Sequence, residues 1–203
     1  MNNLIVGLTG QTGAGKSTVA GFALAMGCRI IDCDLVAREA LSPGSDCLKR
    51  LSELFGSDII DENGCCRRSL LAERAFSDKK KTELLNSVTH PWIIRRSQEY
   101  IEKYSMDFDG VIILDAPLLY ESGGDVLCSK VIAVTAPLDV RLERIMNRDG
   151  ISREHAMLRI NAQKDDEFYT SRADYVVDGS QGLEQVGESI RSIFQKINGR
   201  GAK

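Results

Sequence analysis

The sequence predicts an α/β protein built on a five-stranded parallel sheet flanked by helices. Short apolar runs that end in Asp or Thr alternate with helical stretches, which is typical of parallel strands joined by crossover helices. The 203 residues, 43% hydrophobic and 27% charged, suit one globular domain spanning residues 1–203. The expected strands are residues 4–8, 28–34, 111–115, 130–135 and 173–178.

The first two strands lead into helices with clear punctuation. A helix is expected over residues 17–26, where Gly27 suits the left-handed position that ends helices. After the second strand, residues 35–41 are expected to form a short helix that Pro43-Gly44 interrupts.

A helical block then breaks the alternation of strands and helices. It predicts an inserted helical subdomain over residues 42–104, with His90-Pro91 as a helix entry. A turn or short hairpin is expected at residues 58–64. The expected helices of this block are residues 47–55, 68–76, 80–88 and 90–104.

The carboxyl-terminal third returns to the alternating pattern. Helices are expected at residues 138–148, 152–164 and 183–197, with Asp149-Gly150 breaking the first from the second. The tail, residues 199–203, is expected to fray.

A phosphate-binding loop joins the first strand to the first helix. Gly10, four residues, and then Gly15-Lys16-Ser17 form its signature in the required strand–loop–helix context. Glycines let backbone amides approach phosphate oxygens, and the helix N-terminus adds unpaired amides. Lys16 suits the β- and γ-phosphates, and the Ser17 hydroxyl suits Mg²⁺. The nucleotide-binding residues expected here are Gly10, Gln11, Thr12, Gly13, Ala14, Gly15, Lys16, Ser17 and Thr18.

Two acids end the second strand, at the edge where a transferred phosphate is expected. Asp34 is placed to accept the proton of an attacking hydroxyl. It is equally placed to cap the helix that follows, a frequent role for Asp. Arg38, one turn later, can pair with Asp34 or hold an anionic group of a substrate.

Asp115 and a run of arginines complete the candidate site. Asp115 ends a buried strand and matches the acid that holds Mg²⁺ in phosphate-loop proteins. Arg144 and Arg148 share a helix face and are expected to close over the phosphates, as part of a hinged helical lid. Arg141 and Arg153 are expected to lie on the solvated side.

Composition excludes several classes of protein. A net charge of −3 and a pI near 5.5 disfavour a general nucleic-acid binder. No apolar run is long enough for a membrane span, and no signal peptide is evident, so we expect a cytoplasmic protein. The six cysteines show no metal-ligand spacing and are expected to be free thiols.

The chain resembles the dephospho-CoA kinase family over about 170 residues. The resemblance is carried by Gly7–Ser17, Ile31-Asp-Cys-Asp34 with Ala37-Arg38, His90-Pro91, Asp115–Glu121, Arg144 with Arg148, Arg159–Gln163 and Ala173–Asp178. Their order and spacing make an accidental match improbable. Phosphate-loop switch proteins and transporter ATPases are excluded because their Asn-Lys-x-Asp and Leu-Ser-Gly-Gly-Gln segments are absent.

The resemblance implies a fold, a reaction and a set of roles. It implies a P-loop kinase fold with a helical substrate-binding insertion over residues 42–104 and a helical lid over residues 141–170. The implied reaction transfers the γ-phosphate of ATP, with Mg²⁺, to the ribose 3′-hydroxyl of dephospho-CoA, giving CoA and ADP in the last step of CoA biosynthesis. Asp34 falls where the family places its proton acceptor, which favours catalysis over capping. The implied catalytic residues are Asp34, Lys16 and Arg144; the implied substrate contacts are Asp34, Arg38 and His90; the implied metal ligands are Ser17 and Asp115.

Two other functions remain open from the sequence. One is a different nucleoside or nucleotide kinase, and the other is a regulatory protein that senses a nucleotide and hydrolyses it slowly. The expected partner is a small molecule, with neither nucleic acid nor membrane, and the expected state is a monomer or weak homo-oligomer.

Overall fold

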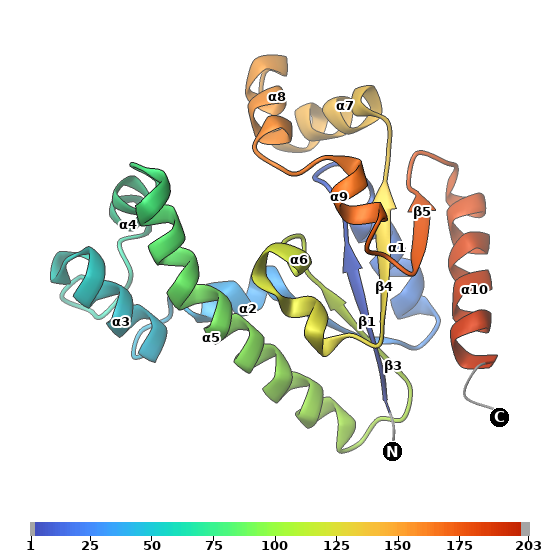
Figure 1. Cartoon of the computed structure of the whole chain (residues 1–203), viewed down its shortest axis with the longest axis horizontal. Helices are drawn as coiled ribbons and strands as arrows, with labels where there is room; N and C mark the ends of the chain where they lie inside the picture. Colours follow the sequence, from blue (N-terminus) through green and yellow to red (C-terminus); the bar gives the residue numbers. More distant parts are fainter. Residues whose placement is uncertain (1–2, 200–203) are drawn as a thin grey trace.

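A computed structural model describes residues 3–199 and the side chains up to residue 197, so most of the expected frayed tail lies outside the described residues. The five strands form one parallel sheet in the order β2-β3-β1-β4-β5 (Figure 1). This confirms the predicted fold class. The strands are β1 (Leu4–Thr9), β2 (Arg29–Asp32), β3 (Val111–Asp115), β4 (Lys130–Thr135) and β5 (Tyr175–Asp178).

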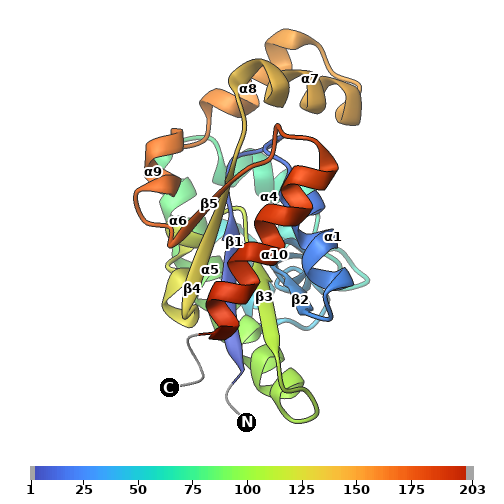
Figure 2. The same ribbon diagram turned by 90° about the vertical axis from the view of Figure 1, so that its right-hand side faces the viewer.

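Each face of the sheet is covered by helices over its own apolar core. Helices α1 (Lys16–Ala25) and α10 (Leu183–Gly199) lie side by side on one face (Figure 2). Their core includes Val6, Ile113 and Ile190. The other face packs on α5 (Lys79–Ser105), α6 (Leu119–Ser122) and α9 (Asp166–Thr170).

The helical insertion projects from one edge of the sheet and has a separate core (Figure 1). The core is formed around the fully buried Leu51 and Ile59. Residues 58–64 begin within a single 3-10 turn, and an isolated antiparallel bridge pairs Ile60 with Cys66. The insertion contains α3 (Asp46–Phe55), the 3-10 helix η1 (Ser57–Ile59), α4 (Arg68–Ala75) and the first half of α5.

The expectation of two helices at residues 80–88 and 90–104 is wrong, because α5 is one continuous helix of 27 residues with Pro91 inside it. A proline removes one backbone hydrogen bond and usually ends or kinks a helix. Here the helix continues because its two halves pack on two different cores: Leu85 and Val88 on the insertion core, and Ile93 and Ile101 on the sheet core. Tertiary packing therefore outweighs the lost hydrogen bond.

Two helices stand beyond the carboxyl ends of the strands (Figure 1). These are α7 (Leu138–Asp149) and α8 (Arg153–Asn161), which share a small core of Leu142, Ile145, Ala156 and Ile160. The expected helix at residues 152–164 is shorter, and the short α9 follows it. Tyr169 of α9 is fully buried against the sheet, so α9 packs with the sheet core.

The remaining elements are short, and the cysteines are free. They are α2 (Cys33–Glu39) after β2, and the 3-10 helix η2 (Gly124–Leu127). All six cysteines are free thiols, as expected. Among residues 3–199, no helix combines the length and apolar composition that a bilayer crossing requires.

Candidate active site

The glycine-rich loop between β1 and α1 has a backbone that only glycine permits. Gly10 has φ +135°, and a Cβ built there would lie 2.1 Å from the carbonyl oxygen of Val134. Gly15 precedes α1 in a left-handed conformation and provides no side-chain cap. The first amides of α1 therefore have no side-chain partner at the Ncap position, and with the helix dipole they form an anion-binding end.

Lys16 lies folded over this loop. Its Nζ donates to the carbonyl oxygen of Gly10 at 2.7 Å and lies 3.4 Å from that of Gln11. Burial lowers the pKa of Lys16, while the carboxylates of Asp115 and Asp34 act in the opposite direction. The loop thus holds an ammonium group close to two acids.

Contacts from the segment after α8 hold the loop in place. The Thr12 amide donates to Gln163 Oε1 at 2.8 Å, and Gln11 Nε2 donates to the Lys164 carbonyl at 2.6 Å. Ala14 is fully buried in the core below the loop. Of the predicted loop residues, Ser17 is exposed, while Thr18 lies within the first turn of α1.

The two acids after the second strand have different roles. Asp32 ends β2 and is the Ncap residue of α2: its Oδ1 accepts from the amides of Asp34 at 2.9 Å and Leu35 at 3.1 Å. The alternative that Asp34 caps this helix is therefore wrong. Strand β2 ends about two residues earlier than expected, and α2 begins and ends about two residues earlier. The reason is that capping by Asp32 starts the helix at Cys33.

Asp34 is consequently free of a capping role. Among residues 3–199 its carboxylate accepts no hydrogen bond. Partial desolvation and the neighbouring Asp32 raise the pKa of Asp34, against the opposing effect of Lys16 and Arg38. This is an unengaged carboxylate beside the phosphate-binding loop.

Asp115 lies next to Asp32 in the register of β2 and β3. Its Oδ1 is buried without a hydrogen-bond partner among the described residues. Burial raises the pKa of Asp115 to about 6, although Lys16 opposes the shift. An orphaned carboxylate oxygen facing a phosphate site fits a hard cation such as Mg²⁺.

The arginines of α7 have different surroundings, and one of them is not placed as the sequence predicts. Arg144 donates to the Gly13 carbonyl at 3.2 Å and to the Gly179 carbonyl at 2.8 Å, so it braces the loop. Arg148 borders the cavity beside the phosphate-binding loop, and its guanidinium pairs with Asp149. Arg153 is exposed, as expected. The expectation that Arg141 is solvated is wrong.

Arg141 is only 5% exposed, and its Nε and Nη1 atoms lack partners among the described residues. The physical reason is the close approach of α7 to the loop: a Cβ on Gly13 would lie 2.7 Å from the Arg141 carbonyl. Helical spacing alone does not reveal this approach.

Two cavities meet at the carboxyl edge of the sheet. The first, the loop cavity, has a volume of about 970 Å³ and is bordered by Lys16, Ser17, Asp115 and Arg144. The second, the apolar cavity, has a volume of about 400 Å³ and lies between α2, α4, α5 and α6. Both are lined by the same three residues, Asp34, Pro117 and Leu118.

The predicted acceptor contacts lie in different places. His90 is half-buried in the wall of the apolar cavity, and burial lowers its pKa. Arg38 lies exposed on α2 and borders neither cavity.

Sequence inspection missed several residues that the structure brings to the site. Asn147, Pro117 and Leu118 border the loop cavity. Leu71 of α4, Phe76 at the C-cap of α4 and Ile93 of α5 help to form the apolar cavity. Pro117 and Leu118 lie in the segment Asp115–Glu121 that carries part of the family resemblance, but the sequence assigned them no role. The apolar residues resemble any helix core until the fold groups them.

The strand order, the phosphate-binding loop and the helical insertion beside it together define a P-loop small-molecule kinase. Comparisons with known proteins narrow this class. A family model described as dephospho-CoA kinase matches residues 4–185. The chain belongs to the dephospho-CoA kinase family.

Individual relatives agree with this assignment. The chain is 41% identical over 193 residues to the dephospho-CoA kinase of Corynebacterium diphtheriae, covering 95% of this chain and 96% of that protein. It is 36% identical to the one from Carboxydothermus hydrogenoformans, covering 95% and 93%.

Solved structures share the architecture. TT1252 from Thermus thermophilus superposes with a TM-score of 0.79 at 30% identity, covering 97% of this chain and 98% of that one. The dephospho-CoA kinase from Campylobacter jejuni gives 0.70 at 26% identity, covering 95% and 96%. A shikimate kinase from Bacteroides thetaiotaomicron shares the fold, with a TM-score of 0.52 at 19% identity.

Proposed function

We propose that this chain transfers the γ-phosphate of ATP to the ribose 3′-hydroxyl of dephospho-CoA, producing CoA and ADP. The observation that carries the proposal is the placement of Asp34, whose side chain lines both the loop cavity and the apolar cavity. A phosphate donor on one side and an alcohol on the other would meet at this carboxylate. Family membership supplies the acceptor.

The phosphates of ATP are held by the loop amides, the α1 N-terminus and Lys16. Lys16 neutralises charge on the phosphate that moves, which requires little displacement of its ammonium group from the loop carbonyls. Arg144 fixes the loop, and Arg148 adds a second cation when it releases Asp149.

Mg²⁺ fits the oxygen atoms that the loop cavity presents. Ser17 and Asp115 would hold it, since the first offers an exposed hydroxyl and the second an unpartnered carboxylate oxygen. Bound there, the ion would neutralise charge on the β- and γ-phosphates. Within residues 3–199 no cluster of three or more His, Cys, Asp or Glu side chains could hold a metal. This fits Mg²⁺ held largely by nucleotide phosphates and water.

Asp34 orients the acceptor hydroxyl and takes up its proton during attack on phosphorus. Partial desolvation and Asp32 raise its pKa, against the opposing effect of Lys16 and Arg38, which makes it a better base than an ordinary aspartate. No hydrogen bond within the described residues must be broken before it accepts one from substrate.

The apolar cavity receives the pantetheine arm of the acceptor. It is enclosed by the helical insertion, residues 42–104, and by α2 and α6. His90 in its wall offers a neutral hydrogen-bonding group, and Arg38 provides positive charge at the surface for the acceptor's diphosphate. The lid within residues 141–170 closes through α7 and α8, which pack on each other rather than on the sheet core. The cellular setting proposed is the cytoplasm, with the chain a monomer or weak homo-oligomer.

The test is an acceptor panel. Purified protein is incubated with ATP, Mg²⁺ and, separately, dephospho-CoA, AMP, CMP or shikimate, and products are identified by mass spectrometry. Dephospho-CoA is expected to gain one phosphate on its ribose with equimolar ADP release. Unchanged dephospho-CoA overturns the proposal. Phosphorylation of another acceptor then identifies a different kinase, and ADP release without any phosphorylated acceptor identifies a nucleotide-sensing NTPase.

A further inference from the structure

We propose that Glu39 is a positioning residue for the phosphoryl transfer. It holds the far end of α2 against α5 and so sets the place of Asp34, which lies at the near end. The inference rests on the proposed function, since it assigns Glu39 a task only if Asp34 is the proton acceptor.

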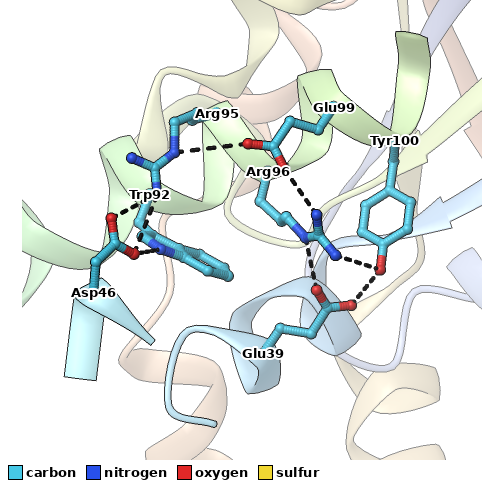
Figure 3. Close-up of polar contacts among 7 residues, drawn as sticks. All are labelled: Glu39, Asp46, Trp92, Arg95, Arg96, Glu99 and Tyr100. Carbon is cyan, nitrogen blue, oxygen red and sulfur yellow. Dashed lines mark hydrogen bonds and ion pairs between the residues drawn. The ribbon is translucent and has the colours of Figure 1, made fainter. Parts of the chain in front are cut away.

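The contacts of Glu39 are unusually complete for a residue at the end of a short helix. Tyr100 Oη donates to Glu39 Oε1 at 2.5 Å, and Arg96 Nε donates to Glu39 Oε2 at 2.8 Å (Figure 3). The Arg96 guanidinium also lies 4.6 Å from the centre of the Tyr100 ring, and its Nη1 donates to Glu99 at 2.7 Å. Both carboxylate oxygens of Glu39 are therefore engaged by α5.

The two ends of α2 are fixed by different means. At its start, Asp32 caps the helix directly after the sheet strand β2. At its end, the chain leaves through Ala40–Ser45, which contains Pro43-Gly44, so no regular element continues from Glu39. Between the ends, Val36 is the one buried residue within α2, and Ala40 at its C-cap is buried in the insertion core. Apolar contacts are not directional, so they restrain the tilt of a helix less than hydrogen bonds do. The Glu39 contacts add directed hydrogen bonds from α5 at this end.

Tilt of α2 would move Asp34 relative to the acceptor. Asp34 and Glu39 are five residues apart, which corresponds to about 7.5 Å along a helix. The wall of the apolar cavity also includes Ile93 and Ser97 of α5, the same helix that supplies Tyr100 and Arg96. The Glu39 contacts thus fix α2, which carries Asp34, against a helix that lines the same cavity.

The expected effect on rate exceeds the expected effect on stability. The side chains of Glu39 and Arg96 are 36% and 37% exposed, and partly exposed ion pairs contribute little to folding. Misplacement of a reacting group by about 1 Å can lower turnover by about 100-fold. A loss of rate without a matching loss of stability is therefore the signature of positioning.

A second set of polar contacts to α5 provides the control. Asp46, at the start of α3, accepts from Trp92 Nε1 at 2.5 Å and from Arg95 Nη2 at 2.9 Å (Figure 3). These contacts tie α3 to α5 through a carboxylate, an arginine and an aromatic donor. Asp46 forms no hydrogen bond with α2 among the described residues, and it borders neither the loop cavity nor the apolar cavity.

The experiment compares Glu39→Gln, Tyr100→Phe and Asp46→Asn for kcat, KM of ATP and thermal midpoint. Glutamine removes the negative charge that faces Arg96 and keeps one acceptor oxygen in place of the two that Arg96 and Tyr100 use. We expect the first two variants to lose about tenfold in kcat with KM of ATP unchanged. Asp46→Asn, which removes a more exposed ion pair on the same helix, is expected to keep its kcat. Unchanged kcat in Glu39→Gln, or an equal loss of kcat in Asp46→Asn, overturns the inference.

A double variant separates this inference from the proposed function. If Glu39 acts through Asp34, adding Glu39→Gln to Asp34→Asn causes no further loss of kcat, whereas independent roles multiply. Full activity in Asp34→Asn itself refutes the proton-acceptor role. An inactive Asp34→Asn with a fully active Glu39→Gln refutes only the positioning role, as does a multiplicative double variant.

Discussion

Asp32 and Asp34 are two residues apart, and the structure gives them separate duties. Asp32 is engaged by the backbone of α2, whereas Asp34 accepts no hydrogen bond within residues 3–199. A cap is worth about 1 kcal/mol to a helix. Because that stabilisation belongs to Asp32, Asp34 is available for chemistry at little cost to folding.

Replacement of Asp34 by Asn is therefore expected to separate activity from stability. The amide keeps the shape but cannot accept the proton, so kcat should fall by about 100-fold or more. The thermal midpoint should stay close to that of the parent protein. Asp32→Ala is the control and should lower the midpoint through loss of the cap. A large drop in midpoint for Asp34→Asn, with activity per folded molecule retained, would contradict the assignment.

Replacement of Asp115 by Asn is expected to stabilise the free protein at neutral pH. The folded-state pKa of about 6 lies above the ordinary 3.8, so the folded form favours the proton. The ionised carboxylate destabilises the fold increasingly as pH rises from about 4 to 6 and fully above that range. A shift of about 2 pKa units is worth at most roughly 3 kcal/mol.

Thermal melts without nucleotide or metal measure this effect. The variant should melt higher than the parent at pH 7.5, and the difference should shrink as pH falls and vanish only below the ordinary pKa of 3.8, where the group is protonated in both the folded and the unfolded state. Activity should be lost because Mg²⁺ loses a ligand. A variant that is less stable at every pH would show that Asp115 is not a strained group.

Residues in the loop could be predicted from sequence, and the burial of Arg141 could not. Gly10, Lys16 and Ser17 are identified by spacing because phosphate chemistry requires those types in that order. Arg141 lies on the same helix as Arg144 and has the same side chain. Only the distance between α7 and the loop decides which of them is buried.

At the scale of elements, α5 joins the helical insertion to the sheet and lines the apolar cavity. It packs on the insertion core at one end and the sheet core at the other, and it supplies the apolar cavity with Ile93 and Ser97. Its uninterrupted length was not predicted, because local rules end helices near proline and the contacts that outweigh them come from residues distant in sequence. The strands were predicted well, since buried parallel strands are continuous apolar runs.

A bulky side chain in α4 should test the apolar cavity. Ala72 lines it, and Ala72→Trp is expected to raise KM for dephospho-CoA by about tenfold or more while KM for ATP stays unchanged. Glu73→Trp adds the same bulk to the exposed side of the same helix and should change neither constant. Equal effects of the two variants, measured by steady-state kinetics, would place the acceptor elsewhere.

At the scale of the whole molecule, the hydrophobic cores around the sheet differ in size. The sheet has an extensive core on each face, while α7 and α8 share only four fully buried side chains. Small cores give small local unfolding energies. The pair that stands over the loop is thus the part of the described chain best suited to open and close.

Hydrogen–deuterium exchange should reveal this difference. Amides of α7 and α8 are expected to exchange faster than those of α1 and α10, and a non-hydrolysable ATP analogue should slow exchange in α7 through Arg144 and Arg148. Protection in α7 equal to that in α1, with no response to the analogue, would contradict a closing role. Peptides from α3 and α4 provide an internal reference, since they form a separate core.

The wall shared by the two cavities also has a pharmacological consequence. Because Asp34, Pro117 and Leu118 line both cavities, the two spaces adjoin at that point. A two-headed inhibitor, with a nucleotide at one end and an apolar tail at the other, could span the junction through a short tether. Its second head would bind at a high effective concentration, so such a molecule should gain affinity well beyond that of either half.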